Sequence, residues 1–180
     1  MAERGARAVF LDKDGTLVEN VPYNVDPALV RLVPGAGAAL RMLREAGFRL
    51  FVVSNQSGVA RGYFPVDALD AVERRVRELL AGDGVEIEAF RWCPHHAEGT
   101  VAGYAVACEC RKPRPGMLLD LAREHALDLT ASWMIGDADA DAEAGLSAGC
   151  RTALIGDCGA PADVHASDLL IATKAIVGLG

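Results

Sequence analysis

Short, unbroken apolar runs alternate along this chain with stretches in which apolar residues recur at helical spacing. The runs that predict strands are 8–11, 48–53, 85–92, 133–135, 152–155 and 169–171, and the stretches that predict helices are 37–46, 66–80, 115–125 and 139–148. Continuous apolar runs are typical of strands that are buried on both faces of a parallel sheet. The pattern therefore predicts an α/β fold with a doubly wound parallel sheet.

Length and composition narrow the class of protein. The chain has 180 residues, of which 51% are hydrophobic and 24% charged, so we expect one globular domain over residues 1–180. The formal charge of −7 argues against nucleic acid or an anionic membrane as a partner. The apolar run at 8–11 is too short for a signal peptide, and no run approaches the roughly 20 residues of a membrane span. We therefore expect a cytoplasmic protein, which we take to be a monomer.

Polar side chains closely follow three of the predicted strands. Asp12 follows the first strand, Ser54 the second and Asp137 the fourth. In open α/β sheets the functional site lies beyond the carboxyl ends of the strands, so we expect these side chains to meet there. Asp14 comes two residues after Asp12 and starts on the same side of the extended chain. Carboxylates this close are costly unless a proton or a cation lies between them, and among cations oxygen ligands suit Mg²⁺.

This set of side chains fits phosphoryl transfer. A carboxylate such as that of Asp12 can attack phosphorus and form an aspartyl-phosphate, and a second group must then protonate the leaving oxygen and activate water. The reaction also needs a cation beside the phosphoryl group, for which Lys112 is the candidate, while Ser54 offers a hydroxyl. The alternative is that Asp12 and Asp14 only serve a turn or a helix cap, which a single Asp-x-Asp-Gly pattern does not exclude.

Three of the five cysteines lie in the segment 93–110, which is interrupted by proline and glycine and is too long for an ordinary loop. Three thiolates and one imidazole make a closed tetrahedral zinc site. We favour His95 over His96 as the imidazole ligand. The predicted zinc ligands are Cys93, His95, Cys108 and Cys110.

A closed zinc site leaves no position open for chemistry, so we expect this zinc to be structural and to hold the loop ahead of Lys112. The alternative is that these cysteines are incidental thiols of a surface loop, although several exposed thiols so close together would be a liability. Cys150 and Cys158 are flanked by small and apolar residues, and we expect them to be ordinary thiols.

With these residues in place, the chain resembles the haloacid-dehalogenase-like (HAD) phosphatases over essentially its whole length. The resemblance rests on the four motifs of that family. Those positions are 10–17 (FLDKDGTL), Ser54, Lys112, and Gly136-Asp137 with Asp141. It implies a Rossmann-like fold, and because the zinc loop is the only insertion in this chain, we expect no large cap domain.

The resemblance also implies a role for each motif residue. Asp12 would be the nucleophile and Asp14 the general acid and base. Ser54 and Lys112 would steady the phosphoryl group. Mg²⁺ would be held by Asp12, by the backbone carbonyl of Asp14 and by Asp137.

The cysteine pattern narrows the resemblance to a zinc-bearing branch, which contains histidinol-phosphate phosphatases and heptose bisphosphate phosphatases. The long loop and the segments 55–62 (NQSGVARG) and 110–117 (CRKPRPGM) favour the heptose enzymes. This implies removal of the 7-phosphate of D-glycero-D-manno-heptose 1,7-bisphosphate, in nucleotide-heptose biosynthesis. The residues implied to bind the sugar phosphate are Asn20, Tyr23, Asn55, Gln56, Ser57, Arg61 and Arg111.

Two positions depart from the pattern of this branch. Ala138 stands where a basic residue usually follows the fourth-motif aspartate, and Val21-Pro22 replaces His-Gly in the segment expected to touch the sugar. Histidinol phosphate, and small sugar phosphates other than the heptose, therefore stay open as substrates. A non-catalytic protein that binds through its zinc loop is the alternative from another class.

Overall fold

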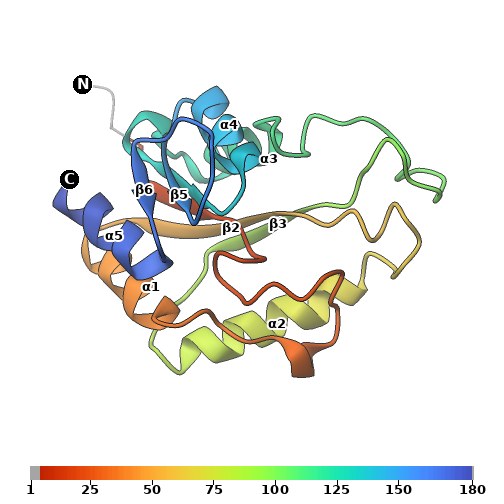
Figure 1. The fold of residues 1–180 in the computed structure, drawn as a ribbon, viewed down its shortest axis with the longest axis horizontal. Coiled ribbons are helices and arrows are strands. Elements are labelled where there is room, and N and C mark those ends of the chain that lie inside the picture. The colour runs from red at the N-terminus through yellow and green to blue at the C-terminus, as the bar shows by residue number, and fades with distance from the viewer. Residues whose placement is uncertain (1–4, 180) are drawn as a thin grey trace.

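The structure, a computed structural model, describes residues 5–179 and is built around one parallel sheet (Figure 1). Six strands lie in the order β3-β2-β1-β4-β5-β6, and every neighbouring pair is parallel. This order is the Rossmann order, and it confirms the predicted doubly wound α/β fold. The strands are β1 (Ala8–Leu11), β2 (Arg49–Asn55), β3 (Ala89–Cys93), β4 (Trp133–Gly136), β5 (Arg151–Ile155) and β6 (Val164–Ala166).

Helices cover both faces of the sheet (Figure 1). One face packs against α1, α2 and α5, and the other packs against α3 and α4. Two short 3₁₀ helices, η1 (Pro27–Leu29) and η2 (Leu129–Ala131), lie in the connections. The helices are α1 (Ala36–Glu45), α2 (Ala68–Ala81), α3 (Gly116–His125), α4 (Asp139–Ala148) and α5 (Leu169–Gly178).

The central strand β1 shows why its sequence is apolar without a break. Val9 and Leu11 belong to the core beneath α1, α2 and α5, whereas Ala8 and Phe10 belong to the core beneath α3 and α4. All four residues are fully buried. Both faces of the strand therefore lie in apolar surroundings, as expected for a strand in the middle of a covered sheet.

The prediction of a strand at 169–171 is wrong, because these residues form the first turn of α5. Asp168 caps this helix, and its carboxylate accepts the backbone N–H of Ile171 at 2.8 Å. A run of three apolar residues fits a strand and a buried helix equally well, so periodicity could not separate them. The last strand is instead β6, a three-residue edge strand that includes the exposed His165.

The predicted strand at 85–92 is shorter than expected. Val85 and Ile87 are buried, but they precede the strand, which runs over Ala89–Cys93 at the edge of the sheet beside β2. The alternation in this segment thus reflects a connection that packs one side against the core.

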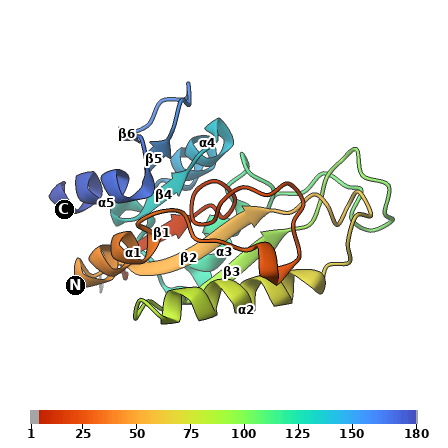
Figure 2. The ribbon, with the colours of Figure 1, turned by 60° about the horizontal axis from the view of Figure 1, so that its bottom comes forward.

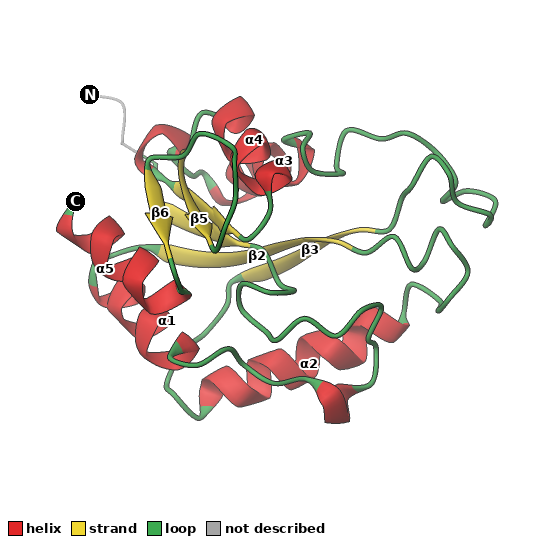
Figure 3. Ribbon diagram, in the orientation of Figure 1, coloured by secondary structure: helices red, strands yellow, loops and turns green. Residues whose placement is uncertain are grey.

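Long connections gather at the carboxyl ends of the strands. The segment 12–35 winds across that end of the sheet, and its only helical turn is η1 (Figure 2). The segment between β3 and α3 contains neither helix nor strand (Figure 3). Among the described residues, no helix has both the length and the hydropathy that crossing a membrane would require.

Candidate active site

Asp12 leaves β1 at the centre of the sheet and is almost completely buried. Its backbone N–H donates to the carbonyl of Ile135 at 2.9 Å, which fixes the residue against β4. Its Oδ1 lies 2.6 Å from the Lys112 ammonium. The end of the sheet therefore holds a buried carboxylate beside a cation, as the sequence predicted.

Lys112 is buried as deeply as Asp12 and has three partners. Its ammonium lies 2.6 Å from Oδ1 of both Asp12 and Asp141, and it donates to the carbonyl of Val53 at 2.9 Å. The side chain of Asn55 binds both backbone groups of Lys112, each at 3.0 Å. Burial alone lowers the pKa of Lys112, but the two carboxylates outweigh it, so the pKa is raised and the ammonium stays charged.

Three carboxylates share this space with one ammonium. One ligand atom from each of Asp12, Asp137 and Asp141 lies within 4.8 Å of the others. Burial raises the pKa of Asp12, and the charges of Asp141 and Asp137 add to the effect, while Lys112 opposes it. Burial and Asp141 likewise raise the pKa of Asp137. A second cation would relieve this repulsion, and an oxygen-only donor set of this kind fits Mg²⁺.

Gly15 shows how tightly the first loop approaches Asp137. The residue has φ +86°, and a β-carbon built on it would lie 2.0 Å from Oδ2 of Asp137. A side chain at this position would displace the carboxylate as well as strain the backbone. The turn after Asp14 therefore brings the first motif against the fourth.

Asp14 is held by donors on both of its carboxylate oxygens. The buried ammonium of Lys13 lies 2.7 Å from Oδ1, and Gln56 Nε2 donates to Oδ2 at 3.0 Å. The same nitrogen of Gln56 donates to Ser54 Oγ at 2.9 Å. The structure thus brings together Asp12, Asp14, Ser54, Lys112 and Asp137 from four separate segments of the chain.

The predicted zinc ligands also lie together, at the end of β3 and in the loop that follows it. One ligand atom from each of the four lies within 4.8 Å of the others, and the sulfur of Cys110 lies 3.0 Å from that of Cys93 and 3.3 Å from that of Cys108. The imidazole nitrogen that faces these sulfurs is Nδ1 of His95. Burial raises the pKa of the Cys93 and Cys110 thiols, so a bound cation is needed to keep them as thiolates. Three sulfurs and one imidazole nitrogen fit a tetrahedral zinc ion.

His96 lies outside this cluster. Its Nε2 is 3.3 Å from Nη2 of Arg61, and its Nδ1 accepts the backbone N–H of Glu98. The Nε of Arg61 is buried and has no hydrogen-bond partner among the described residues. The Arg61 guanidinium is therefore only partly satisfied by the protein.

The other residues implied to bind substrate have varied surroundings. Arg111 and Lys112 line a cavity of about 490 Å³, and Arg111 Nη1 donates to the carbonyl of His95 at 3.4 Å. Tyr23 is half exposed and has φ 55°. Its ring lies edge-on to that of Tyr63, with 4.8 Å between the two ring centroids. Within residues 5–179, no hydrogen bond or ion pair joins the side chain of Asn20, Tyr23 or Ser57 to the carboxylate cluster.

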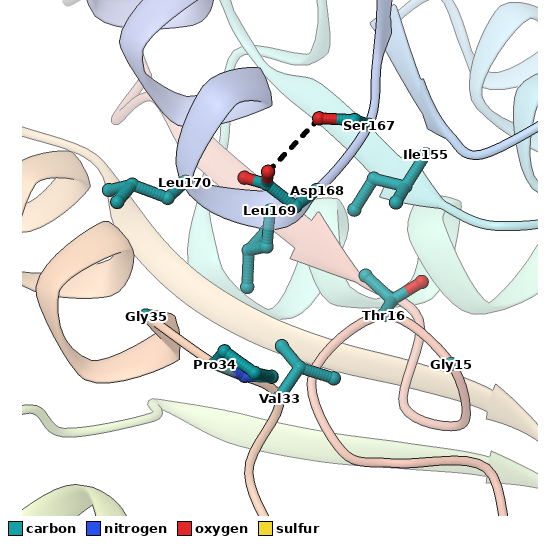
Figure 4. A pocket seen from close by; sticks show the side chains of 10 residues that line it. All are labelled: Gly15, Thr16, Val33, Pro34, Gly35, Ile155, Ser167, Asp168, Leu169 and Leu170. Carbon is teal, nitrogen blue, oxygen red and sulfur yellow. Dashed lines mark hydrogen bonds between the residues drawn. The ribbon is translucent and has the colours of Figure 1, made fainter.

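A further cavity, of about 460 Å³, opens on the other side of the first loop (Figure 4). Gly15 and Thr16 form one wall, and the first residues of α5 form the opposite wall, with Leu169 and Leu170 among them. Most of its lining is apolar, and it contains no lysine or arginine. It therefore offers no cation to a phosphate, whereas the carboxylate cluster contains the ammonium of Lys112.

Sequence reasoning missed several contacts within the site. Lys13 was not singled out, although its position inside the first motif was available as a signal. Asp141 was matched to the fourth motif, but its bond to Lys112 was not expected. Asp139 is the first residue of α4, and its Oδ1 accepts the N–H groups of Gly159 and Ala160, two contacts that the sequence does not predict.

Comparisons with known proteins agree with this geometry. A HAD-hydrolase-like family model matches residues 109–172. A D-glycero-β-D-manno-heptose-1,7-bisphosphate 7-phosphatase of Rhodopseudomonas palustris is 47% identical over 142 residues, which are 79% of this chain and 79% of the relative. A structure from Mesorhizobium loti described as a HAD-like phosphatase has a TM-score of 0.88 at 38% identity, and the match covers 98% of this chain and 88% of the other. The structure of a D,D-heptose 1,7-bisphosphate phosphatase from B. bronchiseptica, complexed with magnesium and phosphate, has a TM-score of 0.82 at 29% identity, covering 97% and 99%.

The parallel sheet and the cluster of carboxylates around a buried lysine define a phosphoric monoester hydrolase of the HAD type. This confirms the resemblance that the four motifs indicated. On the identity of 47% over 79% of both chains, the protein belongs to the family of the D-glycero-β-D-manno-heptose-1,7-bisphosphate 7-phosphatases.

Proposed function

We propose that the protein removes the 7-phosphate of D-glycero-β-D-manno-heptose 1,7-bisphosphate, as a step toward nucleotide-activated heptose. The observation that carries the proposal is the buried Asp12 carboxylate beside Lys112, with Asp14 two residues after Asp12 in the same loop. The name of the Rhodopseudomonas palustris relative supports the substrate and its β anomer. The motif 55–62 and the long loop of the thiol cluster support the same choice.

The reaction takes two steps on the residues of this chain. One carboxylate oxygen of Asp12 attacks phosphorus, the bond between phosphorus and the oxygen on C7 breaks, and Asp14 donates a proton to that oxygen. Water then attacks the phosphorus of the aspartyl-phosphate while Asp14 takes its proton, which returns Asp12 and releases inorganic phosphate. Lys112 and the hydroxyl of Ser54 bind the oxygens of the phosphoryl group throughout.

Two metal ions complete the proposed site. Asp12, Asp137 and the backbone carbonyl of Asp14 would hold Mg²⁺, with Asp141 anchoring Lys112 beside them. When bound, Mg²⁺ would offset the negative charge of the phosphoryl group and of the attacking carboxylate. Zinc at the thiol cluster would hold the loop that leads into Arg111 and Lys112.

Binding of the sugar and its second phosphate is assigned to residues around this centre. The partly satisfied guanidinium of Arg61 and the cavity beside Arg111 suit an anionic group. We propose that Ser57 and the exposed segment with Asn20 and Tyr23 contact the sugar. We further propose a monomer with one domain, 1–180, that acts in the cytoplasm.

The test is a comparison of substrates in the presence of Mg²⁺. Phosphate release is measured for the β and α anomers of heptose 1,7-bisphosphate and for histidinol phosphate. We expect the highest kcat/KM with the β anomer. A higher kcat/KM with histidinol phosphate would overturn the proposed substrate, and no release from any phosphate ester would leave the non-catalytic alternative.

A further inference from the structure

The only glutamine of the chain lies behind two side chains of the reaction. Gln56 is buried, and its amide nitrogen donates to Asp14 Oδ2 at 3.0 Å and to Ser54 Oγ at 2.9 Å. A glutamine amide nitrogen carries two hydrogens, so each of these two acceptors takes one of them. Both donors of the amide are thereby used within the protein, and none is left for substrate.

The chemistry of the two acceptors fixes which way the amide points. Once Asp14 has given up its proton to the leaving oxygen, its carboxylate can only accept, so the nitrogen of Gln56, and not its oxygen, must then face it, as the structure has it. Ser54 Oγ then accepts from Gln56, and its own hydrogen remains free to donate. A phosphoryl oxygen is the acceptor that this hydroxyl would meet in the site. One amide therefore sets the direction of two groups that the reaction uses.

Asp14 is held from one side and open on the other. The side chain of Lys13 is only 3% exposed, whereas that of Asp14 is 30% exposed. Lys13 and Gln56 bind different oxygens of the carboxylate, so the plane of the carboxylate is fixed, not only its position. The remaining lone pairs of both oxygens stay available for a proton that is exchanged with substrate or water.

The backbone of Gln56 is fixed as firmly as its side chain. Its N–H donates to the carbonyl of Cys93 at 2.7 Å, at the point where β3 ends and the thiol cluster begins. Its neighbour Asn55 binds both backbone groups of Lys112. The segment Ser54–Gln56 therefore connects the thiol cluster to the acid and to the lysine of the carboxylate cluster.

We propose that Gln56 is a positioning residue for proton transfer, which orients Asp14 toward the leaving oxygen and Ser54 toward the phosphoryl group. The proposal rests on the function assigned above, in which Asp14 protonates the leaving oxygen. In this proposal Gln56 binds other side chains of the protein, whereas the resemblance implied that it contacts the substrate directly. A positioning role predicts a loss in the chemical step, whereas direct substrate contact predicts a loss in binding.

The test compares two leaving groups in the first turnover, with Gln56→Met as the variant. Methionine has a similar length but no donor. A sugar alkoxide must be protonated as it leaves, whereas p-nitrophenolate leaves without a proton. Rapid-quench release of heptose 1-phosphate should slow on the order of 10²-fold, the usual worth of general acid catalysis. The burst of p-nitrophenolate from p-nitrophenyl phosphate should slow less than about 10-fold, because in that reaction only the orientation of Ser54 is lost and no proton transfer from Asp14 is needed.

Two further variants keep the test decisive. Gln56→Glu retains the shape of the side chain but removes both donors, and it should show the same difference between the leaving groups. Arg123→Gln, at an exposed ion pair on α3, should change neither rate. Thermal unfolding shows whether each variant is folded. If Gln56→Met is not folded, the two rates of Gln56→Glu decide the test.

Equal losses with both leaving groups in both folded variants would overturn the proposal, as would a rise in KM with kcat unchanged. Failure of the proposed substrate gives a different result. In that case the unmodified protein releases p-nitrophenolate but no heptose 1-phosphate. The comparison of leaving groups is then repeated with a simple alkyl phosphate as the substrate in place of the heptose bisphosphate.

Discussion

The carboxylate cluster and the thiol cluster each bring ligand atoms within 4.8 Å, but different parts of the fold support them. Asp12 and Asp137 stand at the ends of neighbouring central strands, so the sheet determines the distance between them. Cys108 and Cys110 lie in a connection without helix or strand, and only Cys93 belongs to a strand. The sheet holds the first cluster in place, whereas three of the four residues of the second cluster lie outside any strand or helix.

This difference explains why the two clusters suit different ions. The carboxylates form an incomplete shell of oxygen ligands around a space that a phosphoryl group can enter, as Mg²⁺ requires in phosphoryl transfer. The thiol cluster supplies four ligands, one from the end of β3 and three from the loop after it, and four ligands are the full shell of a structural zinc ion. Changes to the first cluster should therefore affect catalysis with little effect on stability, and changes to the second should affect both.

The largest effect on catalysis is expected from Asp12→Asn. The amide has the shape of the carboxylate but cannot form the aspartyl-phosphate, so kcat should fall on the order of 10³-fold or more, while the melting temperature changes little. Phosphate release and thermal unfolding measure the two effects. Asp139→Asn is the matched control, because asparagine keeps the oxygen that binds Gly159 and Ala160. Turnover near the wild-type rate in the Asp12 variant would rule out this nucleophile.

Cys110→Ser should break the thiol cluster and separate the two kinds of site. We expect the unmodified protein, purified without chelator, to contain about one equivalent of zinc, and the variant to contain much less and to melt about 5–10 °C lower. Metal analysis and calorimetry give these values. Cys158→Ser is the control, since Cys158 lies outside the cluster and serine can still donate to the carbonyl of Asp137. Undiminished zinc in the Cys110 variant would contradict the assignment.

Gly15→Ala should disturb the carboxylate cluster alone. The new β-carbon would press on Asp137 Oδ2, so the concentration of Mg²⁺ for half-maximal activity should rise about 10-fold, with the zinc content unchanged. Gly149→Ala is the matched control, because Gly149 has nearly the same φ but open space around its β-position. It reports the cost of backbone strain by itself. A similar Mg²⁺ requirement in the two variants would show that contact with Asp137 does not matter.

The smallest effect is expected at Asp168, which belongs to neither cluster. The hydrogen bond from the N–H of Ile171 lowers the pKa of Asp168 in the folded protein. The stabilisation by this hydrogen bond is therefore complete above the pKa of Asp in the unfolded chain, near 3.9, and declines as the pH falls through the lower pKa of the folded protein. Asp168→Ala should cost about 1 kcal/mol of unfolding free energy at pH 7 and less below about pH 4. Urea unfolding at several pH values tests this, and a difference that grows in acid would contradict it.

The parts of the fold that were predictable are those in which local pattern and burial agree. β1 and α4 have the predicted bounds, because the strand is apolar on both faces and the helix ends at a glycine. α5 was not recognised, since ten largely apolar residues lack the polar face that marks a helix. β6 has only three residues and pairs over a short edge, so its sequence carries almost no signal.

The candidate site divides in the same way. The positions of Asp12, Ser54 and Asp137 follow from where their strands end, because all strands are parallel. The partners of those side chains do not follow. The bond from Gln56 to Asp14 and that between Asp141 and Lys112 depend on side-chain directions within connections, which no periodic pattern encodes.

The central place of β1 has a consequence for synthesis of the chain. The N–H of Ala8 binds the hydroxyl of Ser132, 124 residues later, and β1 pairs with both β2 and β4. A nascent chain that has emerged only as far as β3 contains Asp12, but it lacks Lys112 and the strand that covers the second edge of β1. Until β4 arrives, an apolar strand edge is open to mispairing. Because Lys112 and β4 both follow β3 in the chain, the carboxylate cluster can form only after both have been synthesised.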